Sequence, residues 1–207
     1  LNLAIWSVDH YIIQAEWANI SIRSVKHNLQ YGFKFDDSQF IMNQFLHPYH
    51  GGLYFNAARC NGHNFWQSTP YVLGGSLMWE LFMEIEEPSV NDLLTTTLGG
   101  IMMGEIQYRL SSLVLDDSSM GAERTWREIG AGLIDPVRGL NRLFNGKTKK
   151  ISRQKQSESQ SILAEISLGG NTVGEGMSLQ DGKRSPLIKT QLVYGSPFIK
   201  EKRKPFD

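Results

Sequence analysis

The chain has 207 residues, of which 41% are hydrophobic and 20% charged, and its 21 Lys and Arg balance 21 Asp and Glu. A chain of this length and composition can bury a sizeable core, which excludes a wholly disordered protein. The longest apolar stretches, residues 72–85 and 95–103, are too short or too interrupted for a membrane-spanning helix, which needs roughly 20 apolar residues. The single cysteine, Cys60, excludes an internal disulfide.

Charge is distributed unevenly along the chain. Residues 1–145 carry 9 Lys and Arg against 15 Asp and Glu, whereas residues 146–207 carry 12 against 6. Between the two regions, residues 146–161 are rich in Lys, Ser and Gln, a composition typical of a flexible linker. We therefore predict a helical domain over 1–145, a polar linker over 146–161 and a β-strand region over 162–207. Because the first residue is Leu1, we interpret the chain as part of a longer precursor.

Residues 3–23 show helical periodicity with two apolar stripes, which predicts a buried helix. Asp9 and Glu16 lie between these stripes, where an unpaired carboxylate would be costly or would take up a proton. Both acids therefore need partners from elsewhere in the fold. They could be structural ion pairs or hydrogen-bonded acids, or they could be functional acids.

The following segment, which begins at Phe45, is rich in His, Asn, Gly and aromatic residues. Pro48 is expected to open a helix, so that His47 and His50 face the same way in its first turn. The two imidazoles could be ligands, or a base with its orienting partner, or they could cap the helix and bond buried backbone groups. A zinc site would need a third ligand, and no HExxH motif occurs in the sequence.

The helical pattern over residues 71–87 stacks three glutamates on one face, which makes a line of like charges. This face is either solvated or neutralised by cations such as Arg59 and Arg109. A di-iron carboxylate site would need Glu-x-x-His, which the sequence lacks. The three glutamates are Glu80, Glu84 and Glu87.

A long helix is predicted over residues 86–112, with a capping-box-like start at Ser89 and Asp92. Each of its two central glycines costs about 1 kcal/mol of helix propensity, which only close packing would offset. An opposing helix, or alternatively a lipid chain, is therefore expected in near backbone contact with a groove of small side chains. The groove consists of Thr97, Gly100, Gly104 and Ser111.

A neighbouring face of the same helix carries polar residues. Asn91, Glu105 and Arg109 lie together there, and the last two have the four-residue spacing of an ion pair. A further helix at 122–135 ends before Pro136, and a short basic element follows at 137–144. The helical domain is thus predicted to be a bundle of four or five helices.

After the linker the periodicity changes from helical to alternating. Apolar and polar residues alternate over 162–168 and again over 188–194, which predicts two antiparallel strands. A lone hairpin is marginally stable in water, so we expect these strands either to join a sheet supplied by sequence outside this chain or to be poorly held. The predicted fold class is α+β, with a helical bundle followed by strands that look like the start of a β-barrel.

Several segments in order resemble domain-of-unknown-function family 3943 over about residues 40–145: HPYHGGLYFNAAR, FWQS, WELFMEIEEPSVNDLLTTTLGGIMMGEIQYRLS and GLIDPVRGLNRL. The resemblance implies a bacterial envelope protein with a helical block before a β-rich region that resembles an outer-membrane barrel, and YGSPF and KPFD look like the start of that region. It implies an outer-membrane location with a periplasmic helical domain, but no activity. His50 stands where a glutamine is common in the family, which weakens a catalytic pair with His47.

Three functions are compatible with these features. The first is a non-enzymatic module that plugs or scaffolds a β-barrel, its partner being the outer membrane or that barrel. The second is a lipid or small-ligand binding module that uses the groove at Gly100 and Gly104 with the aromatic residues near Trp66. The third is an envelope hydrolase with His47 as base and either Asp92 or Glu105 as its orienter, although the sequence lacks GxSxG.

No catalytic residue, metal or cofactor is assigned from the sequence. Nucleic acid is not an expected partner, because the basic runs at 147–155 and 200–204 lack interleaved aromatic residues. The favoured interpretation is a buried polar network that fixes the register of the helices. The residues of this network, or of a candidate ligand site, are Asp9, Glu16, His47, His50, Glu80, Asn91, Asp92, Glu105 and Arg109.

Overall fold

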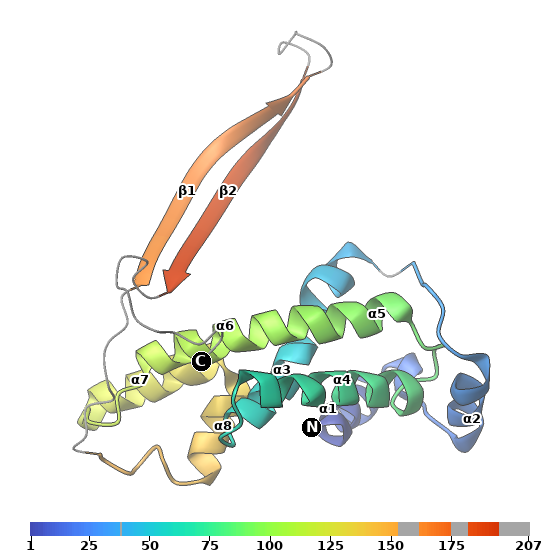
Figure 1. The fold of residues 1–207 in the computed structure, drawn as a ribbon, viewed down its shortest axis with the longest axis horizontal. Coiled ribbons are helices and arrows are strands. Elements are labelled where there is room, and N and C mark those ends of the chain that lie inside the picture. The colour runs from blue at the N-terminus through green and yellow to red at the C-terminus, as the bar shows by residue number, and fades with distance from the viewer. Residues whose placement is uncertain (38, 153–161, 175–181, 195–207) are drawn as a thin grey trace. The chain divides into compact units, whose positions relative to one another are not determined.

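The computed structural model describes residues 1–37, 39–152, 162–174 and 182–194. These residues form a series of helices followed by a two-stranded antiparallel sheet, so the fold class is α+β (Figure 1). The chain divides into a helical unit and a hairpin unit between residues 156 and 157. Much of the predicted linker, residues 153–161, lies outside the described residues.

The helix predicted over 3–23 is broken in the structure. Helix α1 (Asn2–Val8) runs into a π-helical turn, Asp9–Ile13, and a 3-10 turn at Glu16–Ala18 precedes α2 (Ile22–Tyr31). Gln14 ends the π-helical turn at φ 55, in the left-handed region, so the two apolar stripes never align along one axis. Ile12 is 75% exposed, and the prediction of one buried helix is therefore wrong.

The central helices begin at residues that the sequence marks clearly. A π-helical turn at Met42–Leu46 leads into α3 (His47–Arg59), with proline in its first turn, and α4 (Phe65–Phe82) begins after a capping box formed by Asn64 and Gln67. Figure 1 shows α3 and α4 in the middle of the helical unit.

The long predicted helix begins at Ser89, whose hydroxyl accepts a hydrogen bond from the backbone N of Asp92 at 3.2 Å. It consists of α5 (Val90–Leu94), a π-helical turn (Thr95–Gly99) and α6 (Gly100–Val114). Among the described residues, no helix combines the length and the apolar character needed to cross a membrane.

Glycines let α3 approach α6 and the π-helical turn before it. A Cβ atom at Gly51 would lie 1.9 Å from the carbonyl oxygen of Thr96, and one at Gly100 would lie 2.4 Å from the Cα of Gly51. A Cβ atom at Gly104 would likewise lie 2.7 Å from the Cβ of Phe55. The groove of small residues therefore receives a helix and leaves no room for a lipid chain. The apolar core beside this crossing contains Tyr54, Phe55, Phe65 and Val72, with Ile101 packed against it.

The last two helices form a compact corner. Helix α7 (Gly121–Ile134) ends at Asp135, and α8 (Pro136–Phe144) begins at the following proline. The Asp135 carboxylate accepts a hydrogen bond from the backbone N of Arg138 at 3.0 Å and thus caps α8. Gly132 and Gly139 meet where the two helices pack, since a Cβ at Gly139 would lie 2.8 Å from the Cα of Gly132.

The hairpin unit has two faces of different character. Strands β1 (Ile162–Val173) and β2 (Lys183–Tyr194) are 12 residues each and pair with Ile166 opposite Thr190 and Leu168 opposite Ile188. Glu165 and Ser167 lie on the other face, opposite Gln191 and Lys189. Among the described residues the sheet has these two strands and is not closed into a barrel.

Candidate functional site

The predicted polar residues lie in three different places. Asp9 and Glu16 lie in the broken N-terminal region, where Glu16 is exposed and Asp9 is partly buried. Burial raises the pKa of the Asp9 carboxyl group. Neither acid forms an ion pair with another described residue, and the break at Gln14 separates both from the network that the sequence predicted.

His47 lies beside Asp92 in the helical unit. Its Nε2 atom is 3.3 Å from Oδ1 of Asp92, without the geometry of a hydrogen bond, and both side chains are largely buried. Burial lowers the pKa of His47, although the negative charges of Asp92 and Asp36 act in the opposite direction. Asn91, on the same helix as Asp92, accepts a hydrogen bond from the backbone N of Asp36 at 3.0 Å. The structure thus brings three of the predicted residues together.

His50 forms a pair with Tyr54 one turn further along α3. Its Nε2 atom is 2.8 Å from the tyrosine hydroxyl, and its ring meets that of Trp79 edge-on. Burial, with a smaller effect of His47, lowers the pKa of His50 to about 4. Burial also raises the pKa of Tyr54 well above its usual value. Neither group is therefore poised to exchange a proton near neutral pH.

The sequence left open whether the stacked glutamates form a solvated face or are neutralised by cations. The structure shows that they do not form a solvated face. Glu80 is 2% exposed and accepts a hydrogen bond from the backbone N of Ser89 at 2.9 Å. Burial raises the pKa of Glu80 to about 7, and burial together with Glu80 raises that of Glu84. Of the three glutamates, Glu87 alone pairs with a cation, Lys34, among the residues that the structure describes, and its carboxylate also lies 3.4 Å from Nε2 of His27. We call Glu80, Glu84 and Asp92, with His47, the acidic cluster.

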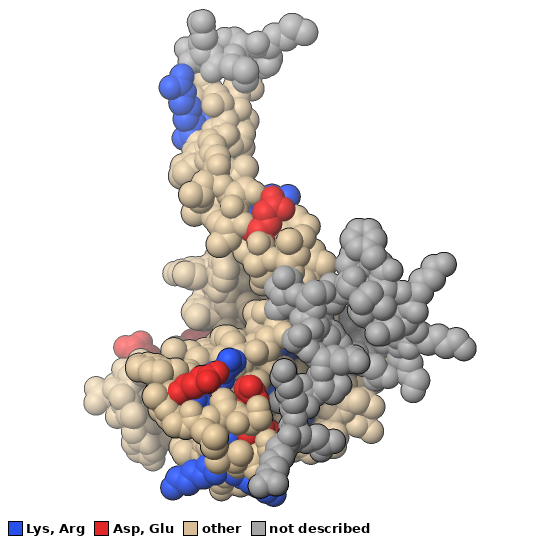
Figure 2. All heavy atoms as spheres, turned by 90° about the vertical axis from the view of Figure 1, so that its left-hand side faces the viewer, with Lys and Arg blue, Asp and Glu red and all other residues tan. Residues whose placement is uncertain are grey.

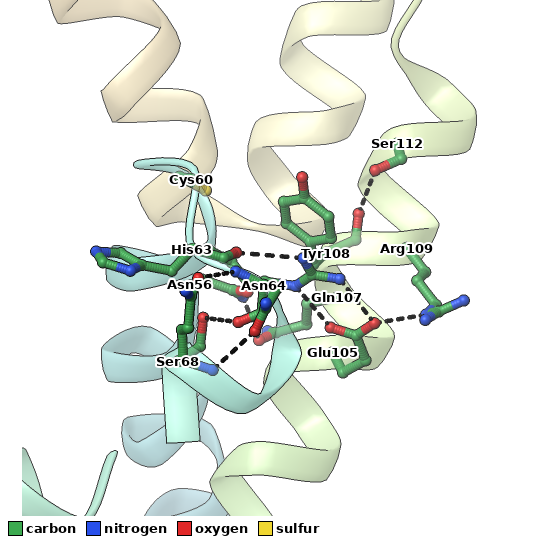
Figure 3. Close-up of polar contacts among 12 residues, drawn as sticks. Asn56, Cys60, His63, Asn64, Ser68, Glu105, Gln107, Tyr108, Arg109 and Ser112 are labelled. Atoms are coloured by element: carbon green, nitrogen blue, oxygen red, sulfur yellow. Dashed lines mark hydrogen bonds and ion pairs between the residues drawn. The ribbon is translucent and has the colours of Figure 1, made fainter. Parts of the chain in front are cut away.

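The cations proposed to neutralise these glutamates bind Glu105 instead. Arg59 donates two hydrogen bonds to its carboxylate, at 3.0 and 3.1 Å, and Arg109 donates one at 2.6 Å. Figure 3 shows the Glu105 carboxylate joined to Arg109, four residues later on α6. This bidentate arrangement leaves Glu105 fully paired and unable to orient His47.

The remaining residues of the small-residue groove have separate surroundings. Ser111 accepts a hydrogen bond from Nη1 of Arg138 at 3.0 Å, so it faces α8 and not α3. The Thr97 hydroxyl is buried with no hydrogen-bond partner among the described residues. Within the predicted groove, the near backbone contact with α3 is thus made at Gly100, and Gly104 meets the side chain of Phe55.

A second polar cluster lies between α7 and α8, and sequence reasoning missed it as a cluster, although the four-residue spacing of Arg124 and Glu128 predicts one of its ion pairs. Arg142 donates to both carboxylate oxygens of Glu128, at 2.9 and 2.7 Å, and to Asp117 at 2.5 Å. Arg124 lies 3.6 Å from Glu128 and 3.8 Å from Asp117. We call these four residues the arginine cluster. A signal for it exists in the sequence, because Arg138 and Arg142 recur at helical spacing on one face of a nine-residue amphipathic helix.

Of the described side chains near the central helices, Ser68, Ser76 and Cys60 are not available as nucleophiles for His47. Ser68 and Ser76 are buried, and Ser68 donates its hydroxyl proton to the carbonyl of Asn64 at 2.8 Å, as Figure 3 shows. Burial, followed by the effect of Asp135, raises the pKa of Cys60 to about 12, which suppresses its thiolate. Among the described residues, no group of three or more His, Cys, Asp or Glu side chains could hold a metal ion.

The chain was compared with protein families, curated proteins and solved structures. A family model described as Domain of unknown function (DUF3943) matches residues 32–137, a range that contains α3, α4, α5, α6 and α7. No curated protein and no solved structure matches the chain. Because the match covers half of the sequence, this chain belongs to the DUF3943 family.

Proposed function

We propose that this protein is a non-enzymatic, structural module of the bacterial cell envelope. In this proposal the hairpin contributes strands to an outer-membrane β-barrel, and the helical unit plugs or scaffolds that barrel from the periplasm. The observation that carries the proposal is the apolar face of the hairpin, which has no partner within the two-stranded sheet.

The length and the pattern of the strands suit a lipid-facing role. Ile166, Leu168 and Ile188 share one face and are 71%, 78% and 70% exposed. Each strand has 12 residues, whereas a tilted membrane-spanning strand needs about 9–11. A barrel strand places apolar side chains toward lipid and polar ones toward the lumen, which matches the alternation found here.

The positions of the charged residues on the hairpin are compatible with a lipid-facing role of its apolar face. Glu165 and Lys189 lie on the face opposite Ile166, and Lys183 and Arg184 lie at the beginning of β2. Figure 2 shows an uncharged stretch of the hairpin between these two groups. A charge on the lipid face near the bilayer centre would cost about 2–4 kcal/mol, so an uncharged stretch favours insertion.

The helical unit supports a structural role rather than a catalytic one. The buried Arg124 and Arg142 are paired with carboxylates, and burial lowers the pKa of both central histidines. Buried ion pairs of this kind favour one helix register over others. The glycine crossing between α3 and α6 has the same consequence, because any side chain there would separate the helices.

The proposal is tested by placing an environment-sensitive dye on each face of the hairpin. In a Cys60→Ala background, Ile166→Cys and Ser167→Cys place a thiol on opposite faces of adjacent residues. With vesicles of phosphatidylethanolamine and phosphatidylglycerol, the dye at 166 should shift its emission to the blue and be quenched by brominated lipid. The dye at 167 should remain quenched by aqueous iodide.

Two results would contradict the membrane role. One is an unchanged emission of both dyes on addition of vesicles, and the other is an equal response at positions 166 and 167. The matched pair controls for the labelling itself, since the two residues are adjacent in β1 and neither is buried.

Binding of a small apolar ligand is a second candidate, favoured by a cavity of about 470 Å³ between α1 and α4. Its lining includes Tyr54, Tyr71, Gly74 and Met78. A Cβ at Gly74 would meet no atom within 4 Å, so Gly74→Leu adds an apolar side chain to the cavity lining without a clash at Cβ. If the cavity binds lipid, this variant should lose binding of a fluorescent fatty acid at an unchanged melting temperature. Equal binding by both proteins would exclude the cavity.

A further inference from the structure

A polar cavity of about 650 Å³ lies within the helical unit, where α3, α6 and α8 meet the turn that follows α8. Its lining is strongly basic, with four cationic side chains and one carboxylate, that of Asp117. Figure 2, which looks onto the α7–α8 end of the helical unit, shows Lys and Arg side chains gathered along its lower edge. The cationic lining residues are Arg138, Arg142, Lys147 and Lys150.

The single carboxylate does not neutralise the two lysines. Asp117 accepts a hydrogen bond from Arg142 at 2.5 Å and lies 3.8 Å from Arg124, so its charge is already paired. Lys147 and Lys150 have no acidic partner among the residues that the structure describes. The cavity therefore holds excess positive charge next to a partly buried wall, where electrostatic attraction is stronger than in open water.

The turn that carries the lysines is held in place by a buried side chain. Arg124 is 7% exposed and donates to the backbone carbonyls of Lys147, Thr148 and Lys150 at 2.7, 2.6 and 3.0 Å. The backbone N of Ser152 donates to the carbonyl of Asp117 at 2.9 Å. Residues 146–152, the first part of the predicted linker, are thus anchored to the helical unit. Such anchoring lowers the entropy cost of bringing two ammonium groups to one site.

Arg138 offers a third cationic group at the base of the cavity. Its guanidinium lies 4.5 Å from the ring centroid of Tyr108, and its Nη1 atom donates to the carbonyl of Tyr108 at 2.8 Å. Its Nε and Nη2 atoms have no hydrogen-bond partner among the described residues. Cys60 lies in the cavity wall, and the positive charges of Arg138 and Lys147 both act to lower the pKa of its thiol. The two cations therefore lie close enough to the same point of the wall to act on one ligand.

We propose that this cavity binds the phosphate group of an anionic ligand. A guanidinium fork and ammonium groups are the side chains that bind phosphate most strongly in proteins. The volume of about 650 Å³ exceeds that of a phosphate ion, so the cavity also has room for the group that the phosphate is esterified to. That ligand is either a soluble phosphomonoester or the headgroup of a phospholipid. The cavity belongs wholly to the helical unit, so its role does not depend on whether the hairpin enters a membrane.

The site is tested by calorimetric titration of the full chain with inorganic phosphate. In Lys147→Ala/Lys150→Ala the dissociation constant should rise by at least about tenfold, because two ammonium groups are lost. The matched control Lys26→Ala/Lys149→Ala removes the same charge from exposed lysines outside the cavity and should change the constant by less than about twofold. Both variants should fold, because all four lysines are exposed and Arg124 binds only backbone carbonyls of the turn.

Two further titrations identify the source of the phosphate. Glycerol phosphate tests a soluble phosphomonoester, and vesicles of phosphatidylglycerol in phosphatidylcholine, against phosphatidylcholine alone, test a headgroup. Binding of either probe that depends on Lys147 and Lys150 supports the site. The proposal is overturned if the unmodified chain binds no phosphate at millimolar concentration, or if both double variants lose affinity equally, since that would indicate attraction by surface charge alone.

Discussion

The acidic cluster and the arginine cluster bury ionisable groups in the same helical unit in opposite ways. In the arginine cluster, two guanidinium groups meet two carboxylates, and Arg142 bonds Glu128 and Asp117 directly. In the acidic cluster, Glu80 is buried and Glu84 is partly buried, neither pairs with a cation among the described residues, and burial raises the pKa of both. One cluster is neutralised by ion pairs and the other by bound protons.

This difference determines how each cluster responds to pH. The ion pairs of the arginine cluster persist across the neutral range, because arginine keeps its proton there and Glu128 has a cationic partner. In the acidic cluster, Glu80 loses its proton as the pH rises through its folded-state pKa of about 7. A substitution in the first cluster should therefore act at every pH, and one in the second should act in a defined window.

The largest effect is expected from Arg142→Met, which retains the length of the side chain but removes its charge. Glu128 and Asp117 then keep only the more distant Arg124, at 3.6 and 3.8 Å. A broken buried ion pair costs about 3–5 kcal/mol, so urea denaturation should show a loss of this order at pH 5, 7 and 8 alike. The control Arg127→Met removes a pair with the exposed Glu123 and should cost about 1 kcal/mol or less. Equal losses in the two variants would refute the buried pairing.

Glu80→Gln should increase the stability of the fold, in contrast to Arg142→Met, and the increase should depend on pH. The folded-state pKa of Glu80 is raised above its unfolded value of 4.5, so its contribution is complete below pH 4.5 and is lost as the pH rises through about 7. Glutamine can still accept from the backbone N of Ser89 but cannot ionise. Between pH 5 and pH 8, the free energy of unfolding of the variant should rise relative to that of the unmodified chain by on the order of 1–3 kcal/mol. Urea denaturation at each pH measures this difference. Parallel stability curves over this range would show that Glu80 is not protonated in the folded state.

Local signals in the sequence identified part of this architecture. Pro48 lies in the first turn of α3, Ser89 caps α5, and Pro136 begins α8, each as its residue type indicates. The two glycines of α6 favoured a close helix approach because each is costly in a helix, and Gly51 faces Gly100 in the structure. Signals of this kind depend on a few neighbouring residues and on the preferences of the backbone.

Features that depend on distant residues could not be derived in this way. The spacing of Glu80 and Glu84 is the same on a solvated and on a buried face, so only the packing of α2 and α5 against α4 distinguishes them. Arg59 lies 46 residues from Glu105, and Arg124 lies 24 residues from Thr148, whose carbonyl it binds. The break at Gln14 has no proline or glycine to announce it, and it removes Asp9 and Glu16 from the predicted network.

His50→Gln tests how a partly buried histidine next to His47 of the acidic cluster responds to low pH, and it should have the smallest effect on stability. The pKa of His50 falls from 6.5 to about 4 on folding, so its contribution is complete above pH 6.5 and is lost as the pH falls through about 4. The contribution of Glu80 to the free energy of unfolding increases as the pH falls over the same range. Both proteins contain Glu80, so this contribution cancels when their stabilities are subtracted. Glutamine can bond the Tyr54 hydroxyl without titrating. Because His50 is only partly buried, solvent screening reduces the full effect of its pKa shift, so the variant should gain about 1–2 kcal/mol of stability relative to the unmodified chain between pH 7 and pH 4. A constant difference across this range would mean that His50 charges as readily in the folded chain as in the unfolded one, which its burial against Trp79 opposes.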